Sequence, residues 1–163
     1  MDEVHDSVIR IRAAASGEAI ECVRALFQEY WTSFGFTPCF QNFDSELAAL
    51  PGKYAAPRGR LLLATVNGQP AGCVALRPVD QARGEVKRLY VRPQFRGSGV
   101  GKALMNSLAA EAHRIGYAEL IADTIPKVMA TALAMYERLG FEHIEPYSNE
   151  TPEAQHIRLR LRT

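Results

Sequence analysis

The chain has 163 residues, of which 47% are hydrophobic and 23% charged, as is usual for a soluble globular protein. Its 19 basic and 18 acidic residues leave a formal net charge of +1, so charge gives no reason to expect nucleic acid or a membrane surface as a partner. The N-terminus lacks a basic segment followed by a long apolar run, and no stretch approaches the roughly 18 apolar residues of a membrane span. We therefore expect one domain over residues 1–163 and a cytoplasmic location.

Hydrophobic periodicity and turn residues predict strands and helices along the whole chain. Asn67-Gly68 separates two apolar runs and is a strong hairpin signal, whereas Gly116 and Gly140 end two helical patterns. The order predicts an α/β fold with a mixed sheet of six to seven strands and helices on both faces. The predicted strands lie near residues 8–12, 60–66, 71–76, 85–91, 119–123, 141–145 and 155–161, and the predicted helices near residues 20–31, 44–50, 100–115 and 127–139.

The segment 96–104, RGSGVGKAL, joins a predicted strand to a predicted helix and resembles a phosphate-binding turn. A nucleoside-triphosphate loop requires GxxxxGK followed by a hydroxyl residue, but Arg96 stands at the first glycine position and Ala103 at the hydroxyl position. The dinucleotide fingerprint GxGxxG fits the first two glycines, but its third glycine would fall on Lys102. The sequence therefore excludes both nucleotide motifs.

The three glycines at positions 97, 99 and 101 leave a different anion site as the best interpretation. Glycine lets backbone N–H groups approach a ligand closely, and the dipole of the following helix favours an anion at its N-terminus. This arrangement suits a diphosphate bound without a metal. The alternative is a strand-to-helix turn without a ligand, although such a turn needs one glycine and not three.

Three motifs resemble the GNAT superfamily of N-acetyltransferases. Arg96-x-x-Gly99-x-Gly101 is similar to that family's coenzyme A pyrophosphate loop, and it follows LYVRP (residues 89–93), which resembles the family's typical strand ending. Residues 132–141, ALAMYERLGF, resemble the family's A-x-x-LYE-x-LGF helix end. The predicted strand order agrees with the family over nearly the whole chain. The resemblance implies a GNAT-like fold and a single N-acetyltransferase domain.

The resemblance also implies how the donor binds. Two parallel strands, near residues 85–91 and 119–123, would splay apart and hold acetyl-coenzyme A in the gap without a metal. Side chains of Arg96 and Lys102 either add charge to this site or lie in solvent, and Met129 departs from the asparagine that family members often carry. The residues implied for coenzyme A are Leu89, Tyr90 and Val91, whose backbone pairs with the pantetheine arm, and Arg96, Gly97, Ser98, Gly99, Val100, Gly101 and Lys102 at the pyrophosphate.

Two side chains are implied in the chemistry. Tyr136 resembles the family tyrosine that protonates the departing thiolate; the alternative is a core aromatic on an amphipathic helix. Glu85 is the candidate general base, because some members carry a glutamate there and burial beside the thioester is expected to raise its pKa. The alternative for Glu85 is a strand-start residue paired with Lys87 or Arg83.

The implied reaction transfers acetyl from acetyl-coenzyme A to a primary amine by direct attack in a ternary complex. The acceptor is a small-molecule amine or a peptide, and alternatives are an acyl-coenzyme A sensor without turnover or an acyltransferase for a peptide or protein amine. A homodimer is compatible with the sequence but does not follow from it. Asp44 and Glu46 are candidates to attract a cation, and an aromatic set either lines the acceptor pocket or closes the core: Trp31, Phe34, Phe36, Phe40 and Phe43.

Overall fold

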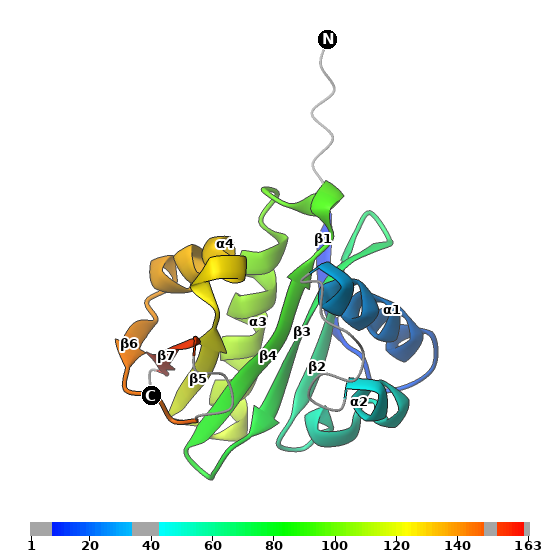
Figure 1. Cartoon of the computed structure of the whole chain (residues 1–163). Coiled ribbons are helices and arrows are strands. Elements are labelled where there is room, and N and C mark those ends of the chain that lie inside the picture. Colours follow the sequence, from blue (N-terminus) through cyan, green and yellow to red (C-terminus); the bar gives the residue numbers. More distant parts are fainter. Residues whose placement is uncertain (1–7, 34–42, 149–152, 162–163) are drawn as a thin grey trace.

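The computed structural model describes residues 8–33, 43–148 and 153–161, with the backbone only for residues 126–130. Figure 1 shows a central sheet with helices packed against it. The strands are β1 (Ile9–Ala13), β2 (Arg60–Val66), β3 (Gln69–Pro78), β4 (Arg83–Val91), β5 (Glu119–Thr124), β6 (Glu142–Ile144) and β7 (Gln155–Arg160). The helices are α1 (Gly17–Ser33), α2 (Phe43–Ala49), α3 (Val100–Ile115) and α4 (Pro126–Arg138), with short 3-10 helices at Gly52–Tyr54 and Pro93–Phe95.

The predicted order of strands and helices is confirmed, and the differences lie at element ends. The β2–β3 hairpin turns at Asn67 and Gly68, whose φ angles of 51° and 85° are the left-handed pair of a type I′ turn. β3 starts earlier than predicted because Gln69 and Pro70 already pair with the end of β2. Periodicity does not reveal this, since such pairing depends on the turn geometry.

The seven strands form one mixed sheet in the order β1-β2-β3-β4-β5-β7-β6. Among the described strands, β4 and β5 form the parallel pair and all other neighbours are antiparallel. The predicted mixed sheet of six to seven strands is therefore confirmed. Its single parallel junction is where the two halves of the sheet meet.

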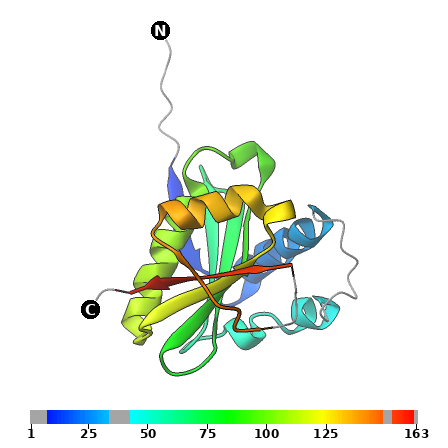
Figure 2. The same ribbon diagram turned by 60° about the vertical axis from the view of Figure 1, so that its left-hand side comes forward.

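Helices cover both faces of the sheet (Figure 2). On one face, α3 and α4 pack on a core that includes Leu104, Leu108 and Tyr136. On the other face, α1 and α2 pack on a second core, to which Phe27 and Trp31 contribute. None of the helices in the described ranges is long and apolar enough to cross a membrane.

β4 and β5 separate soon after they begin. Within the described residues, their pairing runs from Arg83–Glu119 to Glu85–Ile121, after which β4 continues to Val91 and β5 to Thr124 without further pairs. The predicted splayed strands near residues 85–91 and 119–123 are therefore confirmed. The resulting gap, closed at Glu85 and open towards Val91, places the candidate site.

Candidate active site

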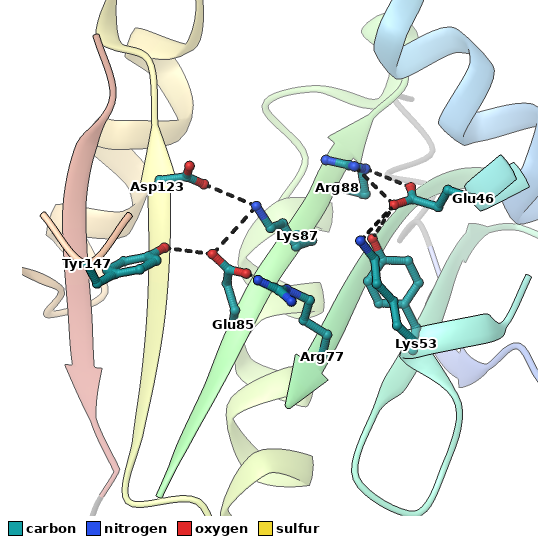
Figure 3. A network of polar contacts seen from close by, with 9 residues as sticks. Glu46, Lys53, Arg77, Glu85, Lys87, Arg88, Asp123 and Tyr147 are labelled. Carbon is teal, nitrogen blue, oxygen red and sulfur yellow. Dashed lines mark hydrogen bonds and ion pairs between the residues drawn. The ribbon is translucent and has the colours of Figure 1, made fainter. Parts of the chain in front are cut away.

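A bulge in β4 divides the polar side chains along the gap into two groups. Cys73 of β3 pairs with Tyr90, and Ala75 pairs with Lys87. The interval between these pairs is two residues long on β3 but three on β4, so β4 contains one extra residue, a β-bulge. The extra residue lies at Arg88, whose φ of 58° is a left-handed conformation that costs a non-glycine residue on the order of 1–3 kcal/mol. In Figure 3, Lys87 consequently reaches towards β5, and Arg88 reaches towards α2.

Arg88 and Glu46 form a buried ion pair, which we call the bulge pair. The Arg88 guanidinium donates to both oxygens of Glu46, at 2.9 and 3.1 Å, and lies 4.9 Å from the Trp31 ring. The Tyr54 hydroxyl and the Lys53 ammonium also contact Glu46, at 2.9 and 3.3 Å. Burial by itself raises the pKa of Glu46, but the hydrogen bond and charge of Arg88 outweigh burial and hold that pKa below its usual value. The bulge pair ties α2 to the strained residue of β4.

A second group of charged and polar side chains lines the closed end of the gap, and we call it the gap cluster (Figure 3). Lys87 lies between two carboxylates, 3.5 Å from Glu85 and 3.5 Å from Asp123, and so bridges β4 and β5. Glu85 also accepts from Arg77 at 2.5 Å and from the Tyr147 hydroxyl at 2.8 Å. The cluster therefore joins three strands to the connection between β6 and β7.

The pKa of Glu85 was expected to be raised by burial, and this expectation is wrong, because the pKa is lowered overall. The side chain is 2% exposed, and burial by itself does raise the pKa. The charges of Lys87 and Arg77, together with the hydrogen bonds from Tyr147 and Arg77, outweigh burial and hold the pKa below its ordinary value. Of the two partners considered from sequence, Lys87 is confirmed, whereas Arg83 pairs instead with Asp80 at 2.9 Å.

Tyr136 packs its ring in the core and is 6% exposed, with the Phe141 ring 5.1 Å away. Burial raises the pKa of Tyr136 well above its ordinary value, and the charges of Tyr30 and Asp123 raise it further. Tyr30 belongs to α1 and Tyr136 to α4, helices on opposite faces of the sheet. Tyr136 is therefore protonated over the neutral pH range, and its helix α4 packs against β5, one of the two strands that separate.

The glycine loop, residues 96–102, follows β4 at the open end of the gap (Figure 1). Gly97 and Gly99 have φ angles of 81° and 91°, and a Cβ added to either would have no neighbour within 4 Å. The first helical hydrogen bond of α3 runs from the Ala103 N–H to the Gly99 carbonyl, at 3.0 Å. The amides before Ala103 are therefore outside the helix ladder. These two glycines leave space for a ligand beside the N–H groups of the first helical turn, which fits a diphosphate.

Gly101 has a different role from that of the other two glycines. A Cβ at this position would lie 3.1 Å from the Met135 sulfur, so Gly101 permits the close contact of α3 with α4. The predicted approach of a ligand to Gly101 is thus not what requires glycine there. Arg96 and Ser98 also bond within the protein, since the Arg96 Nε donates to the Val91 carbonyl at 2.9 Å and the Ser98 hydroxyl donates to the Phe95 carbonyl. Lys102 and Val100 occupy the first turn of α3, Lys102 exposed and Val100 buried.

The end of β4 offers a backbone edge towards the gap. Leu89 packs on the α3 side of the sheet and Tyr90 on the α1 side, so their side chains point away from the plane of the gap. In the described part of the chain, neither these residues nor Val91 pairs with β5. An unpaired strand edge can bind an extended ligand as an added strand. This position suits the predicted contact with a pantetheine arm.

Three residues of the gap cluster were not found by sequence reasoning: Arg77 on β3, Asp123 near the end of β5, and Tyr147 after β6. Of the two alternatives for the aromatic set, Trp31 and Phe43 follow the second: both are buried, with ring centroids 4.7 Å apart, and they close the core. Asp44 is exposed, whereas Glu46 belongs to the bulge pair. Phe34, Phe36 and Phe40, and the side chain of Met129, lie outside the described residues.

Neither a metal-binding cluster nor a reactive thiol is found among the described residues of the gap. These residues contain no group of three His, Cys, Asp or Glu side chains arranged to hold a metal ion. Cys73 is fully buried, and burial raises the pKa of its thiol well above the ordinary value. A buried, protonated thiol is a poor nucleophile.

Comparison with known proteins agrees with this geometry. A model of the acetyltransferase (GNAT) family matches residues 21–141. An uncharacterised N-acetyltransferase of Schizosaccharomyces pombe is 35% identical over 158 residues, covering 95% of this chain and 96% of the relative. A GNAT-family acetyltransferase structure from Staphylococcus aureus has a TM-score of 0.80 at 18% identity, covering 95% of this chain and 100% of its own. An acetyltransferase of Salmonella typhimurium, solved with its cofactor acetyl-CoA, has a TM-score of 0.72 at 19% identity, with 94% of each chain covered.

The chain belongs to the GNAT acetyltransferase family. It is accordingly an N-acetyltransferase that uses acetyl-CoA as its donor. The glycine loop and the open edge of β4 fit that donor, since one offers backbone N–H groups to an anion and the other offers an unpaired strand edge.

Proposed function

We propose that this protein transfers the acetyl group to a primary amine by direct attack on acetyl-CoA in a ternary complex. The observation that carries the proposal is the position of Tyr136. Tyr136 keeps its hydroxyl proton, and its helix α4 packs against β5, one of the two strands that separate. A proton donor at this place serves a reaction whose leaving group is a thiolate.

The donor is proposed to bind along the gap. Backbone amides of Gly97 to Lys102 would hold its pyrophosphate at the N-terminus of α3, where the helix dipole favours an anion. The backbone of Leu89, Tyr90 and Val91 would pair with the pantetheine arm. Arg96 is proposed to hold the loop in place through its hydrogen bond to the Val91 carbonyl rather than to contact the pyrophosphate.

The donor supplies an activated acetyl thioester. The amine nitrogen forms a C–N bond to the acetyl carbonyl carbon as the C–S bond breaks, and the sulfur takes the proton of the Tyr136 hydroxyl. The attacking nitrogen then releases its extra proton to water as the amide forms, and water returns a proton to the Tyr136 oxygen. The ammonium form of the amine first loses a proton to water. General acid catalysis by a well-placed side chain typically contributes about 10²- to 10⁴-fold in rate.

Glu85 is proposed to position its neighbours rather than to take the proton of the amine. It is nearly inaccessible, it accepts from Arg77 and Tyr147, and its pKa lies below the ordinary value, which makes it a weak base. Among the described residues, direct attack is favoured over an acetyl-cysteine route, because Cys73 is buried and protonated and Cys22 lies on α1, outside the gap cluster. Cys39 lies outside the described residues.

The proposal is tested by thiol release from acetyl-CoA across a panel of primary amines, amino acids, polyamines and peptides. We expect release that depends on an amine, and mass spectrometry should show one acetyl group added to that amine. Tight binding of acetyl-CoA without release for any panel member would contradict acetyl transfer to amines and favour an acyl-CoA sensor. Tertiary amines, which have no N–H to exchange for an acetyl group, should remain unmodified and provide an internal control.

A further inference from the structure

We propose that Asp123 forms the binding site for the ammonium group of the acceptor, at the closed end of the gap between β4 and β5. The inference rests on the proposed function, because it assigns the group that receives the primary amine. The ligand class is an alkyl ammonium. The site centres on one accessible carboxylate, which lies 3.5 Å from the Lys87 ammonium across the gap.

The backbone places Asp123 at the correct depth. The last pair between β4 and β5 joins Glu85 to Ile121. Asp123 follows Ile121 by two residues, so the side chains of Ile121 and Asp123 project from the same face of β5. Across the gap, the Asp123 carboxylate lies 3.5 Å from the Lys87 ammonium (Figure 3). This contact is the first one beyond the point where the strands join. A donor bound along β4 from the glycine loop would have its thioester end near this place.

Asp123 is the carboxylate of the gap with room for a ligand. Its side chain is 23% exposed, against 2% for Glu85. Glu85 accepts short hydrogen bonds from Arg77 and Tyr147, whereas the Lys87 contact of Asp123 is longer than the usual 2.7–3.2 Å of such bonds. A carboxylate accepts several N–H donors, so Asp123 can bind an ammonium while Lys87 keeps its contact with Glu85.

The charge of Asp123 acts on three tyrosines. Its negative charge contributes to the raised pKa of Tyr30, of Tyr136 and of Tyr147, which belong to α1, to α4 and to the connection before β7. A carboxylate beside aromatic rings is a favourable environment for an alkyl ammonium, through charge-assisted hydrogen bonds and cation–π contact. An amine bound here would lie on β5, the strand against which α4, the helix of Tyr136, packs. The same place thus binds the acceptor and presents it to the thioester.

The test uses two coenzyme A thioethers and needs no turnover. S-(2-aminoethyl)-coenzyme A carries an ammonium two carbons from the sulfur, and S-propyl-coenzyme A has the same length without the charge. By calorimetry, we expect the wild type to bind the aminoethyl thioether about 10-fold more tightly, which corresponds to about 1.4 kcal/mol. Asp123→Asn should remove this preference and leave the affinity for S-propyl-coenzyme A unchanged.

Glu119→Gln is the matched control. Glu119 lies on the same strand, and its side chain is also 23% exposed. Its carboxylate pairs with Arg158, which is not part of the gap cluster, at an N–O distance of 3.9 Å. This variant should keep the full preference. Unchanged affinity for S-propyl-coenzyme A shows that each variant is folded with an intact donor site.

Equal binding of the two thioethers by the wild type, or a preference that persists in Asp123→Asn, would overturn the ammonium site and leave acetyl transfer intact. If the wild type bound neither thioether, the donor site itself would be contradicted, and both proposals would fail together.

Discussion

The glycine loop and the gap cluster lie at opposite ends of one gap but use different chemistry. The loop presents backbone amides, and its specificity depends on two left-handed glycines and the start of α3. The gap cluster presents side chains from β3, β4, β5 and the connection before β7, arranged by a bulge at Arg88. A backbone site suits a ligand that all members of a family share, as proposed for the donor, whereas a side-chain site can differ between members, as proposed for the acceptor.

The largest expected effect is a loss of folding stability when the bulge pair is broken, a change that does not touch the glycine loop. Glu46→Ala removes the partner of Arg88, whose side chain is 7% exposed, and leaves a buried charge unpaired. We expect the free energy of unfolding to fall by about 3–5 kcal/mol, measured by urea denaturation.

Glu21→Ala is the control for that loss. Glu21 pairs with Arg24 on the surface of α1, where its side chain is 69% exposed, and such pairs contribute about 0–1 kcal/mol. Equal destabilisation by the two variants would mean that the bulge pair does not hold the fold around the gap.

A second substitution tests whether the glycine loop binds coenzyme A. Gly99→Val places a β-branched residue at a φ of 91° and adds bulk beside the loop amides. The affinity for coenzyme A, measured by calorimetry, should fall at least about 100-fold, or about 2.7 kcal/mol.

Gly68→Val provides a matched control for the strain. Gly68 has a φ of 85° and equally open surroundings, but it lies in the β2–β3 hairpin. Its substitution should destabilise the protein and leave coenzyme A affinity unchanged. Similar loss of affinity in both variants would assign the effect to strain rather than to the loop.

The smallest effect concerns Glu85 and its dependence on pH. Because the pKa of Glu85 is lower in the folded protein than its ordinary 4.5, ionised Glu85 stabilises the fold above that pH. This contribution is lost as the pH falls through the folded-state pKa. The difference in unfolding free energy between wild type and Glu85→Gln should therefore shrink on acidification below about pH 4.5. A difference that grows on acidification would mean that burial dominates.

The donor half of the site is predictable because its signals are local in sequence. Three glycines between a strand and a helix, with the motif around Tyr136, identify the loop and the tyrosine from the amino-acid sequence alone. Even there, the pattern assigns Gly101 the same role as its neighbours, although its contact with Met135 depends on how α3 packs on α4.

The acceptor half is not predictable in this way because it depends on pairing between distant strands. One extra residue in β4 determines where Lys87 and Arg88 point, and nothing in EVKRLYV marks it. Asp123 meets Lys87 only after β4 and β5 pair in register, 36 positions apart. The sequence suggests Lys87 as a partner of Glu85 but not Arg77 or Tyr147, since these two come from segments whose positions do not follow from periodicity.

The proposed role of Tyr136 is to protonate the leaving sulfur. It is tested most directly by comparing turnover of wild type, Tyr136→Phe and Tyr117→Phe with the amine that the wild type acetylates fastest. Tyr117 is also buried, but its hydroxyl donates to the Arg58 carbonyl at 2.8 Å, away from the gap. We expect kcat of Tyr136→Phe to fall about 100-fold with coenzyme A affinity within about twofold, and Tyr117→Phe to keep wild-type kcat. An unchanged kcat for Tyr136→Phe near neutral pH would contradict the account.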